Sequence, residues 1–284
     1  MKPAPFELHR PDSLAEALAL LHEHGAEARL IAGGQSLMPM MNLRLVSFSH
    51  LVDLNRVPGL AGIRQEDGML RIGAMTRQQD IARHPLVARH APLLAAALPY
   101  IGHIQTRSRG TMGGSLAHAD PSAELPLTAV VLNARLTIQS HEGRREVDAR
   151  DFFRDMLSTD LAPDEILTEI SIPAAPPGTR VSFREYARRR GDFALAAAAA
   201  QYVESPAGNT LAVGLGGVNP APYYCAQLSQ SLSGAAAGDR AALEPLIRAE
   251  LENLQPLSDT EADQDYRRTL ARILLEDCIR EVLQ

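Results

Sequence analysis

The chain has 284 residues, enough for one large domain or two to three small ones with a sizeable core, which excludes a disulfide-stabilised miniprotein. It carries 28 Lys and Arg against 34 Asp and Glu, a formal charge of −6, so it lacks the basic excess of a nucleic-acid-binding protein. Two Cys are too few for an iron–sulfur cluster or a Cys-rich zinc site. Any electron transfer by this chain would therefore use an organic cofactor or the metal of a partner.

The first 55 residues predict a small α/β lobe. Ser13 and Glu16 have capping-box spacing, and leucines at helical intervals follow, which predicts a helix over residues 14–24. Short apolar runs predict strands at residues 29–32 and 50–54.

Residues 56–173 predict a second lobe that alternates hairpins with helices. Gly68 and Gly143 each lie in a predicted hairpin, and a second capping-box pattern begins at Thr76. Pro85 and Pro92 interrupt the helical pattern that follows Thr76. The expected elements are strands at 60–64, 69–73, 135–139, 145–148 and 166–172 and helices at 76–98 and 123–132.

The Pro- and Gly-rich segment 173–178 is the predicted domain boundary. Residues 193–203 favour a helix by their alanines, but the flanking turn signals and the length favour a strand. We expect strands at 180–188, 193–203 and 211–218 and helices at 239–254 and 261–283. The chain shows neither a signal peptide nor an apolar run of about 20 residues that could span a membrane, so the cytoplasm is the expected location.

Two double-glycine segments, each followed by a serine, carry the strongest chemical signal. The first is Ala32-Gly33-Gly34-Gln35-Ser36, and the second is Thr111-Met112-Gly113-Gly114-Ser115. Either alone is well explained as a tight turn. Backbone N–H groups in glycine turns also form concavities that hold phosphate oxygens, with hydroxyls as further donors. As a pair they favour a bound dinucleotide, and a side chain at Gly113 is expected to block the approach of its pyrophosphate.

Other candidate residues have two interpretations each. The nine His form no zinc-protease motif and are expected to be scattered on the surface, and Asp120 before Pro121 is better explained by turn formation than by a metal pair with His118. The Arg184–Arg190 cluster is either a solvated strand face or a contact for a ligand phosphate or an acidic partner. Phe193 is either a core residue or the wall of a planar ring.

Three motifs resemble one family. They are residues 32–39 (AGGQSLMP), residues 111–121 (TMGGSLAHADP) and residues 191–194 (GDFA). Together they are similar to the FAD-binding medium subunit of molybdenum hydroxylases, the enzymes related to aerobic carbon monoxide dehydrogenase and xanthine dehydrogenase. The resemblance runs through essentially the whole chain, and residues 164–167 and 213–218 also fit.

The resemblance implies an α+β fold: a two-lobed FAD-binding domain of the vanillyl-alcohol-oxidase (PCMH) type over residues 1–173, with lobes of about 1–55 and 56–173, and a small α+β C-terminal domain over 178–284. It implies that FAD is held by the two glycine motifs, by a nucleotide pocket with Glu124, and by Phe193 near the flavin ring. The implied cofactor-binding residues are Ala32, Gly33, Gly34, Gln35, Ser36, Leu37, Ile101, Thr111, Gly113, Gly114, Ser115, Asp120, Glu124, Leu167, Arg184 and Phe193.

The chain departs from the family pattern at two positions. Gln35 stands where many members have His, so a His-linked covalent flavin is not expected. Glu185 occupies the place of a common Lys, and Arg184 either supplies the positive charge instead or the flavin environment differs.

By resemblance, the chain passes electrons from two [2Fe-2S] clusters in a small partner subunit through FAD to an external acceptor. The substrate is then oxidised at a molybdenum-pterin cofactor in a large partner, within a dimer of heterotrimers. A self-contained flavin oxidase of the vanillyl-alcohol type and a nucleotide-binding module without redox chemistry are the alternatives.

Overall fold

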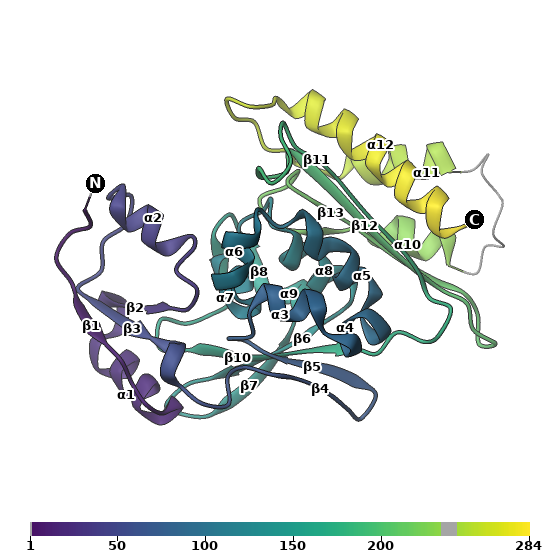
Figure 1. Cartoon of the computed structure of the whole chain (residues 1–284). Coiled ribbons are helices and arrows are strands. Elements are labelled where there is room, and N and C mark those ends of the chain that lie inside the picture. Colours follow the sequence, from purple (N-terminus) through teal and green to yellow (C-terminus); the bar gives the residue numbers. More distant parts are fainter. Residues whose placement is uncertain (1, 234–242) are drawn as a thin grey trace.

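The computed structural model describes residues 2–233 and 243–284, which form three lobes in chain order (Figure 1). The first lobe holds a parallel three-stranded sheet in the order β1-β3-β2, with α1 packed against it. Its elements are β1 (Glu7–His9), α1 (Leu14–His24), β2 (Ala28–Ile31), α2 (Leu37–Asn42) and β3 (His50–Asp53).

Helix α1 forms as its sequence predicts. Ser13 Oγ accepts a hydrogen bond of 3.2 Å from the Glu16 N–H, and Gly25 with a φ of +51° ends the helix. Ala17 and Leu21 of α1 are buried in one cluster with Val52 of β3. The apolar stripe of the helix therefore fixes it on the sheet that carries the first glycine motif.

The second lobe is built on an antiparallel five-stranded sheet in the order β4-β5-β10-β6-β7, with helices on one side (Figure 1). Pro85 and Pro92 are the first residues of separate short helices, as the interrupted pattern predicts. The strands are β4 (Ile63–Glu66), β5 (Met69–Gly73), β6 (Arg135–Gln139), β7 (Arg144–Asp148) and β10 (Ile166–Pro173), and β8 (Phe153–Asp155) pairs separately with β9 (Ser158–Thr159). The helices are α3 (Gln78–Arg83), α4 (Pro85–His90), α5 (Pro92–Ala97), α6 (Ile104–Arg109), α7 (Met112–His118), α8 (Glu124–Val131) and α9 (Ala149–Phe152).

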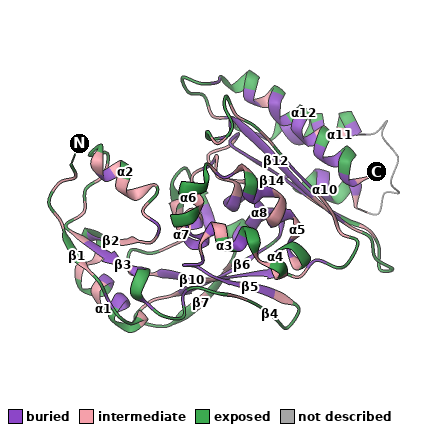
Figure 2. Ribbon diagram, viewed as in Figure 1, coloured by how far each residue is buried: buried purple, intermediate pink, exposed green. Residues whose placement is uncertain are grey.

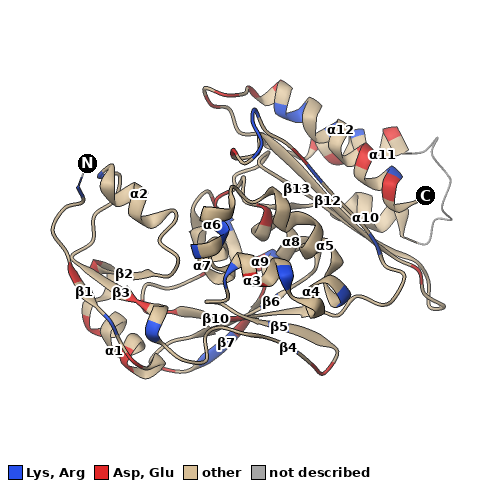
Figure 3. Cartoon of the chain, viewed as in Figure 1, with Lys and Arg blue, Asp and Glu red and all other residues tan. Residues whose placement is uncertain are grey.

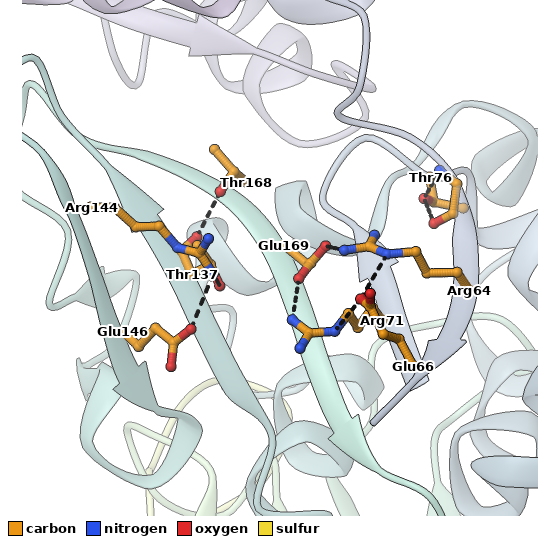
Figure 4. Close-up of polar contacts among 10 residues, drawn as sticks. Arg64, Glu66, Arg71, Thr76, Thr137, Arg144, Glu146, Thr168 and Glu169 are labelled. Atoms are coloured by element: carbon orange, nitrogen blue, oxygen red, sulfur yellow. Dashed lines mark hydrogen bonds and ion pairs between the residues drawn. The ribbon is translucent and has the colours of Figure 1, made fainter. Parts of the chain in front are cut away.

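The two faces of this sheet differ in chemistry. Ile72, Leu136 and Ile170 lie in register and are buried in the core cluster that the helices share. One residue away along β10, Glu169 pairs with Arg64 at 2.6 Å and Arg71 at 3.1 Å (Figure 4). The alternation places the charged network on the other face, so the helices that carry the second glycine motif pack on the apolar side.

The capping box predicted at Thr76 is wrong. Arg77 is the N-cap of α3 and its side chain makes no capping bond. Thr76 Oγ1 instead accepts from the Gly62 N–H at 2.9 Å and donates to the Gly62 carbonyl at 3.1 Å (Figure 4). A tertiary contact has taken the hydroxyl that the local pattern assigned to the helix.

The third lobe holds an antiparallel sheet in the order β11-β12-β13-β14 with α12 along one face (Figure 1). Its elements are β11 (Arg180–Tyr186), β12 (Ala196–Val203), β13 (Thr210–Gly216), β14 (Tyr223–Tyr224), α10 (Ala226–Leu232), α11 (Leu243–Glu252) and α12 (Gln264–Val282). The predicted helix over 239–254 is described from Leu243 onward, and residues 239–242 lie outside the described residues.

The strand predicted at residues 193–203 is confirmed from Ala196 onward. Strand β12 contacts α12 and also α8 of the second lobe, and Ala196–Ala200 are all buried (Figure 2). Small side chains let a helix approach each face of the strand, so packing decides against the helical propensity of alanine.

Lys and Arg are distributed over many elements of the described chain rather than gathered in one stripe (Figure 3). Within the described ranges, no helix is both long and apolar enough to cross a bilayer.

Candidate functional site

The two glycine motifs lie in contact although they are far apart in sequence. A Cβ on Gly33 would stand 2.9 Å from the Cα of Gly110, and a Cβ on Gly114 would stand 3.6 Å from that of Ala32. The loop after β2 and the start of α7 therefore form one site between the first two lobes.

The first motif has the free donors of an anion site. Gly34 has a φ of +72°, a conformation that favours glycine. Among the described residues, no acceptor meets the backbone N–H groups of Gly34, Gln35 and Ser36. The Gln35 side chain donates 3.2 Å to the Gly33 carbonyl and stabilises the turn. Successive unpaired N–H groups in a glycine turn attract phosphate oxygens.

The second motif is a helix start, so the expectation of a second glycine turn with free N–H groups is wrong. Thr111 caps α7 by accepting from the Gly114 N–H at 3.0 Å. The Met112 and Gly113 N–H groups donate to the carbonyls of Thr76 at 3.1 Å and Ala74 at 2.8 Å. The polar groups that this motif can offer a ligand are the hydroxyls of Thr111 and Ser115.

Gly113 serves packing. A Cβ on this residue would stand 2.5 Å from the Ala74 Cβ and 2.9 Å from the Ala74 carbonyl oxygen. A side chain at Gly113 would point into the protein, contrary to the expectation that it would block a pyrophosphate.

A bridge of two side chains and two backbone carbonyls, which no sequence motif indicated, connects the glycine motifs. Asn55 Nδ2 donates to the Ala32 carbonyl at 2.9 Å, and Arg77 Nη2 donates to Asn55 Oδ1 at 2.5 Å. Arg77 Nη1 also donates to the Arg109 carbonyl. Burial, and to a smaller extent the neighbouring Arg109 charge, lower the pKa of Arg77, while the Asp80 and Asp53 charges act in the opposite direction. The basic run Arg107-Ser108-Arg109 directly before Gly110 was the available sequence signal.

Carboxyl groups gather near the other end of α7. Asp120 Oδ1 accepts from the Ser122 N–H at 2.9 Å, which is the turn-forming role favoured for this residue. Burial, with the Asp120 charge as a smaller cause, raises the pKa of Glu124 to about 7. Burial and the Glu124 charge raise the pKa of Glu185 to about 8. The carboxyl of Glu124 on α8 therefore acts on that of Glu185 on β11, and both groups are partly protonated at neutral pH.

Arg184 lies outside this group. Its guanidinium binds Glu281 of α12, with an Nη2–Oε2 distance of 3.0 Å. Because neighbouring strand residues point to opposite faces, Arg184 points toward α12 while Glu185 points toward Glu124. The direction of Arg184 favours the second of the two alternatives, a flavin environment that differs from the family's, and contact of Arg184 with the cofactor stays a prediction.

Phe193 is exposed, so its interpretation as a core residue is wrong. Its side chain is 70% exposed. The preceding Gly191 lies against the start of α6, since a Cβ there would stand 2.7 Å from His103 Cε1. The segment thus presents an aromatic ring beside the second lobe, and its contact with a flavin stays a prediction.

Ile101 and Leu167 are only 7% and 5% exposed and belong to the core cluster of the second lobe. Arg107 Nη1 donates to the Ile101 carbonyl at 2.6 Å and to the Gly102 carbonyl at 2.9 Å, which fixes the backbone before α6. Direct contact of Ile101 and Leu167 with a nucleotide stays a prediction.

The histidines are not all scattered. His9, His24 and His50 of the first lobe come together, against the expectation for the nine His as a group.

Two family matches cover this fold. Residues 4–175 match the FAD binding domain in molybdopterin dehydrogenase, and residues 181–282 match the CO dehydrogenase flavoprotein C-terminal domain. The chain belongs to this family of FAD-binding subunits. Its fold is the PCMH-type FAD-binding domain followed by the flavoprotein C-terminal domain.

Relatives and solved structures agree over the full length. The chain is 36% identical to the 6-hydroxypseudooxynicotine dehydrogenase complex subunit alpha of Paenarthrobacter nicotinovorans, over 100% of this chain and 96% of the relative. It is 37% identical to the carbon monoxide dehydrogenase medium chain of Hydrogenophaga pseudoflava, over 95% of this chain and 94% of the relative. The structure of carbon monoxide dehydrogenase from the latter organism superposes with a TM-score of 0.95 at 35% identity, covering 99% of this chain and 98% of that chain. That of quinoline 2-oxidoreductase from Pseudomonas putida 86 superposes with a TM-score of 0.93 at 37% identity, covering 100% and 99%.

The predicted class is confirmed: the chain is the FAD subunit of a multi-subunit, molybdenum-dependent oxidoreductase.

Proposed function

We propose that this chain binds FAD at the joined glycine motifs and places it as the electron-transfer station between two [2Fe-2S] clusters of a small partner and an external acceptor. The observation that carries the proposal is the row of unpaired N–H groups at Gly34–Ser36 beside the start of α7. FAD accepts electrons singly or in pairs, which suits an exchange with one-electron clusters.

In this proposal each residue of the site binds or orients the cofactor. The Gly34, Gln35 and Ser36 N–H groups hold one side of the pyrophosphate, and the hydroxyls of Thr111 and Ser115 hold the other. The backbone around the pyrophosphate is shaped by Ala32, Gly33, Leu37, Gly113 and Gly114. The nucleotide pocket is lined by Asp120, Glu124, Ile101 and Leu167. Phe193 lies against the flavin ring.

The cysteine chemistry of the chain supports clusters on another subunit. Cys225 and Cys278 are both free and buried, and burial raises the pKa of both thiols. Neither is poised as a thiolate ligand. We propose a small iron–sulfur partner and a large molybdenum-pterin partner in a dimer of heterotrimers, with residues 173–178 as the boundary between the two domains of this chain. The cytoplasm stays the expected location of this complex.

The substrate is chosen elsewhere in the proposed complex. Relatives at 36%, 37% and 36% identity carry the names of 6-hydroxypseudooxynicotine dehydrogenase, carbon monoxide dehydrogenase and nicotine 6-hydroxylase. Similar medium chains thus serve dissimilar substrates, which supports a substrate pocket in the large partner.

Affinity purification of the tagged full-length chain from its native cells tests the proposal. We expect a flavin absorption band, iron, molybdenum and two further chains, one small and one very large. A single-chain flavoprotein reduced directly by an organic substrate would support the self-contained oxidase instead. A colourless preparation that binds no added FAD, or one that binds only a nucleotide, would overturn the FAD assignment.

A further inference from the structure

Three imidazole side chains from three different elements converge in the first lobe. His9 ends β1, His24 ends α1 and His50 begins β3. In the parallel pairing of β1 with β3, Glu7 lies opposite His50, so Glu7, His9 and His50 share one face of the sheet. Helix α1 packs against β3 and brings His24 to the same place.

The geometry is close to that of a metal site. His9 Nε2 lies 3.0 Å from His50 Nδ1, and one ring nitrogen from each of the three histidines lies within 4.8 Å of the others. Two ligand nitrogens on a tetrahedral zinc ion lie about 3.3 Å apart, because each Zn–N bond is about 2.0 to 2.1 Å. Closing the site requires the His24 ring to rotate out of its stack on His50, where the ring centroids lie 3.8 Å apart, so that a His24 nitrogen points at the ion.

A carboxylate completes the donor set. Glu7 Oε1 lies 3.9 Å from His9 Nε2, and Glu7 Oε2 lies 3.8 Å from His50 Nδ1. The His9 and His50 side chains are 17% and 20% exposed, so the rings are largely shielded while Glu7 is 67% exposed and free to turn inward. Three imidazoles and one carboxylate form a donor set suited to zinc and neighbouring divalent metals.

We propose that His9, His24 and His50, with Glu7 as the fourth ligand, bind a divalent transition-metal ion of the zinc class. The site joins β1, α1 and β3 where β3 begins, whereas the first glycine motif follows the opposite end of the parallel sheet. The ion would therefore have a structural role, holding β1, α1 and β3 of the first lobe together. It would be separate from the cofactor site and independent of the proposed function.

Calorimetric titration of the chelator-treated, full-length chain with Zn²⁺ tests this site. We expect one zinc ion to bind tightly per chain and the melting temperature to rise with zinc, since a ligand that binds only the folded state stabilises it. Cobalt substituted for zinc should give the strong visible absorption of a tetrahedral site. No tight equivalent in the wild-type chain would overturn the proposal.

The variants His24→Asn and His22→Asn form a matched pair on one helix. His22 stacks on His141 at 4.9 Å and is not part of the cluster. We expect His24→Asn to weaken zinc binding by more than about tenfold and to lose the thermal shift, because an inner ligand is lost, while His22→Asn keeps both. Equal binding by His24→Asn and wild type would overturn the site.

Circular dichroism and FAD content show whether His24→Asn is folded. If the circular dichroism spectrum and the FAD content match those of wild type, the weaker zinc binding results from the loss of the His24 ligand. If the variant is misfolded, His9→Gln replaces it, and wild-type zinc affinity in folded His9→Gln would equally overturn the site.

Discussion

The backbone of Gly33 lies directly against that of Gly110, and a Cβ on residue 33 would stand 2.9 Å from the Gly110 Cα. This contact, between residues of two lobes, is what turns two separate glycine motifs into one site. A side chain at position 33 cannot be accommodated by moving a neighbouring side chain, because the atoms that Gly33 meets are backbone atoms.

Gly33→Ala should therefore separate the motifs and weaken FAD binding. Overpacking of this kind costs about 1 to 3 kcal/mol, and each 1.4 kcal/mol is about tenfold in affinity. We expect at least a tenfold loss, measured by fluorescence titration of the flavin-free chain. Gly143→Ala is the control, because a Cβ on Gly143 meets no atom within 4 Å. Equal affinity in the two variants would contradict the joined site.

Gly113→Ala should act on stability rather than on the ligand. Alanine in a helix is favoured over glycine by about 1 kcal/mol, but here its Cβ would stand 2.5 Å from the Ala74 Cβ, and overpacking costs about 1 to 3 kcal/mol. We expect the clash to dominate and the free energy of unfolding of the flavin-free chain to fall in urea denaturation. Adding Ala74→Gly removes the Cβ that the new side chain meets and should restore part of the lost free energy of unfolding. The recovery should be only partial, because close contacts with the backbone of residue 74 remain. A stabilised Gly113→Ala chain would show that the helix start does not pack as described.

These two glycines also show what sequence could and could not predict. The Ser13 cap and the leucines of α1 act within one helix, so local pattern predicted that element correctly. The two motifs predicted residues that the structure brings together, but the role of Gly113 depends on Ala74, and the first N–H groups of α7 are bound by the carbonyls of Ala74 and Thr76. Such contacts arise only when distant segments pack.

The same reason explains the residues that were missed or misplaced. Asn55 and Arg77 matter because they bridge two loops, and no motif encodes that bridge. For Arg184, which resemblance gave as one possible substitute for the family Lys, strand alternation and Glu281 direct the side chain toward α12, a packing effect that no motif encodes. His9, His24 and His50 are separated in sequence by stretches that carry no metal-ligand spacing, and only the sheet register unites them.

Phe193→Ala should leave stability unchanged and alter the flavin. Because the ring is 70% exposed, its loss removes little buried area, and surface substitutions usually change stability by less than about 0.5 kcal/mol. We expect a shifted flavin absorption or fluorescence spectrum in the reconstituted chain. Ile273→Ala, at a residue 42% exposed on α12, is the control and should leave the spectrum unchanged. Identical spectra for all three proteins would remove Phe193 from the flavin site.

The paired carboxyls predict a pH dependence of the flavin-free chain. Folding raises the pKa of Glu124 to about 7 and that of Glu185 to about 8, from an ordinary 4.5. Between pH 4.5 and 8 the folded state therefore binds more protons than the unfolded state, so the free energy of unfolding should fall as the pH rises through this window. Glu185→Gln removes one of the two groups that take up a proton in the folded state. We expect the variant to lose less stability across the window than wild type and to be the more stable protein at its upper end, as measured by urea denaturation at both ends.

Glu142→Gln, at an exposed hairpin residue, should follow the wild-type profile. A Glu185→Gln profile as steep as that of wild type would mean that Glu185 is ionised in the folded chain, and that Glu124 does not meet a buried, protonated neighbour across the site.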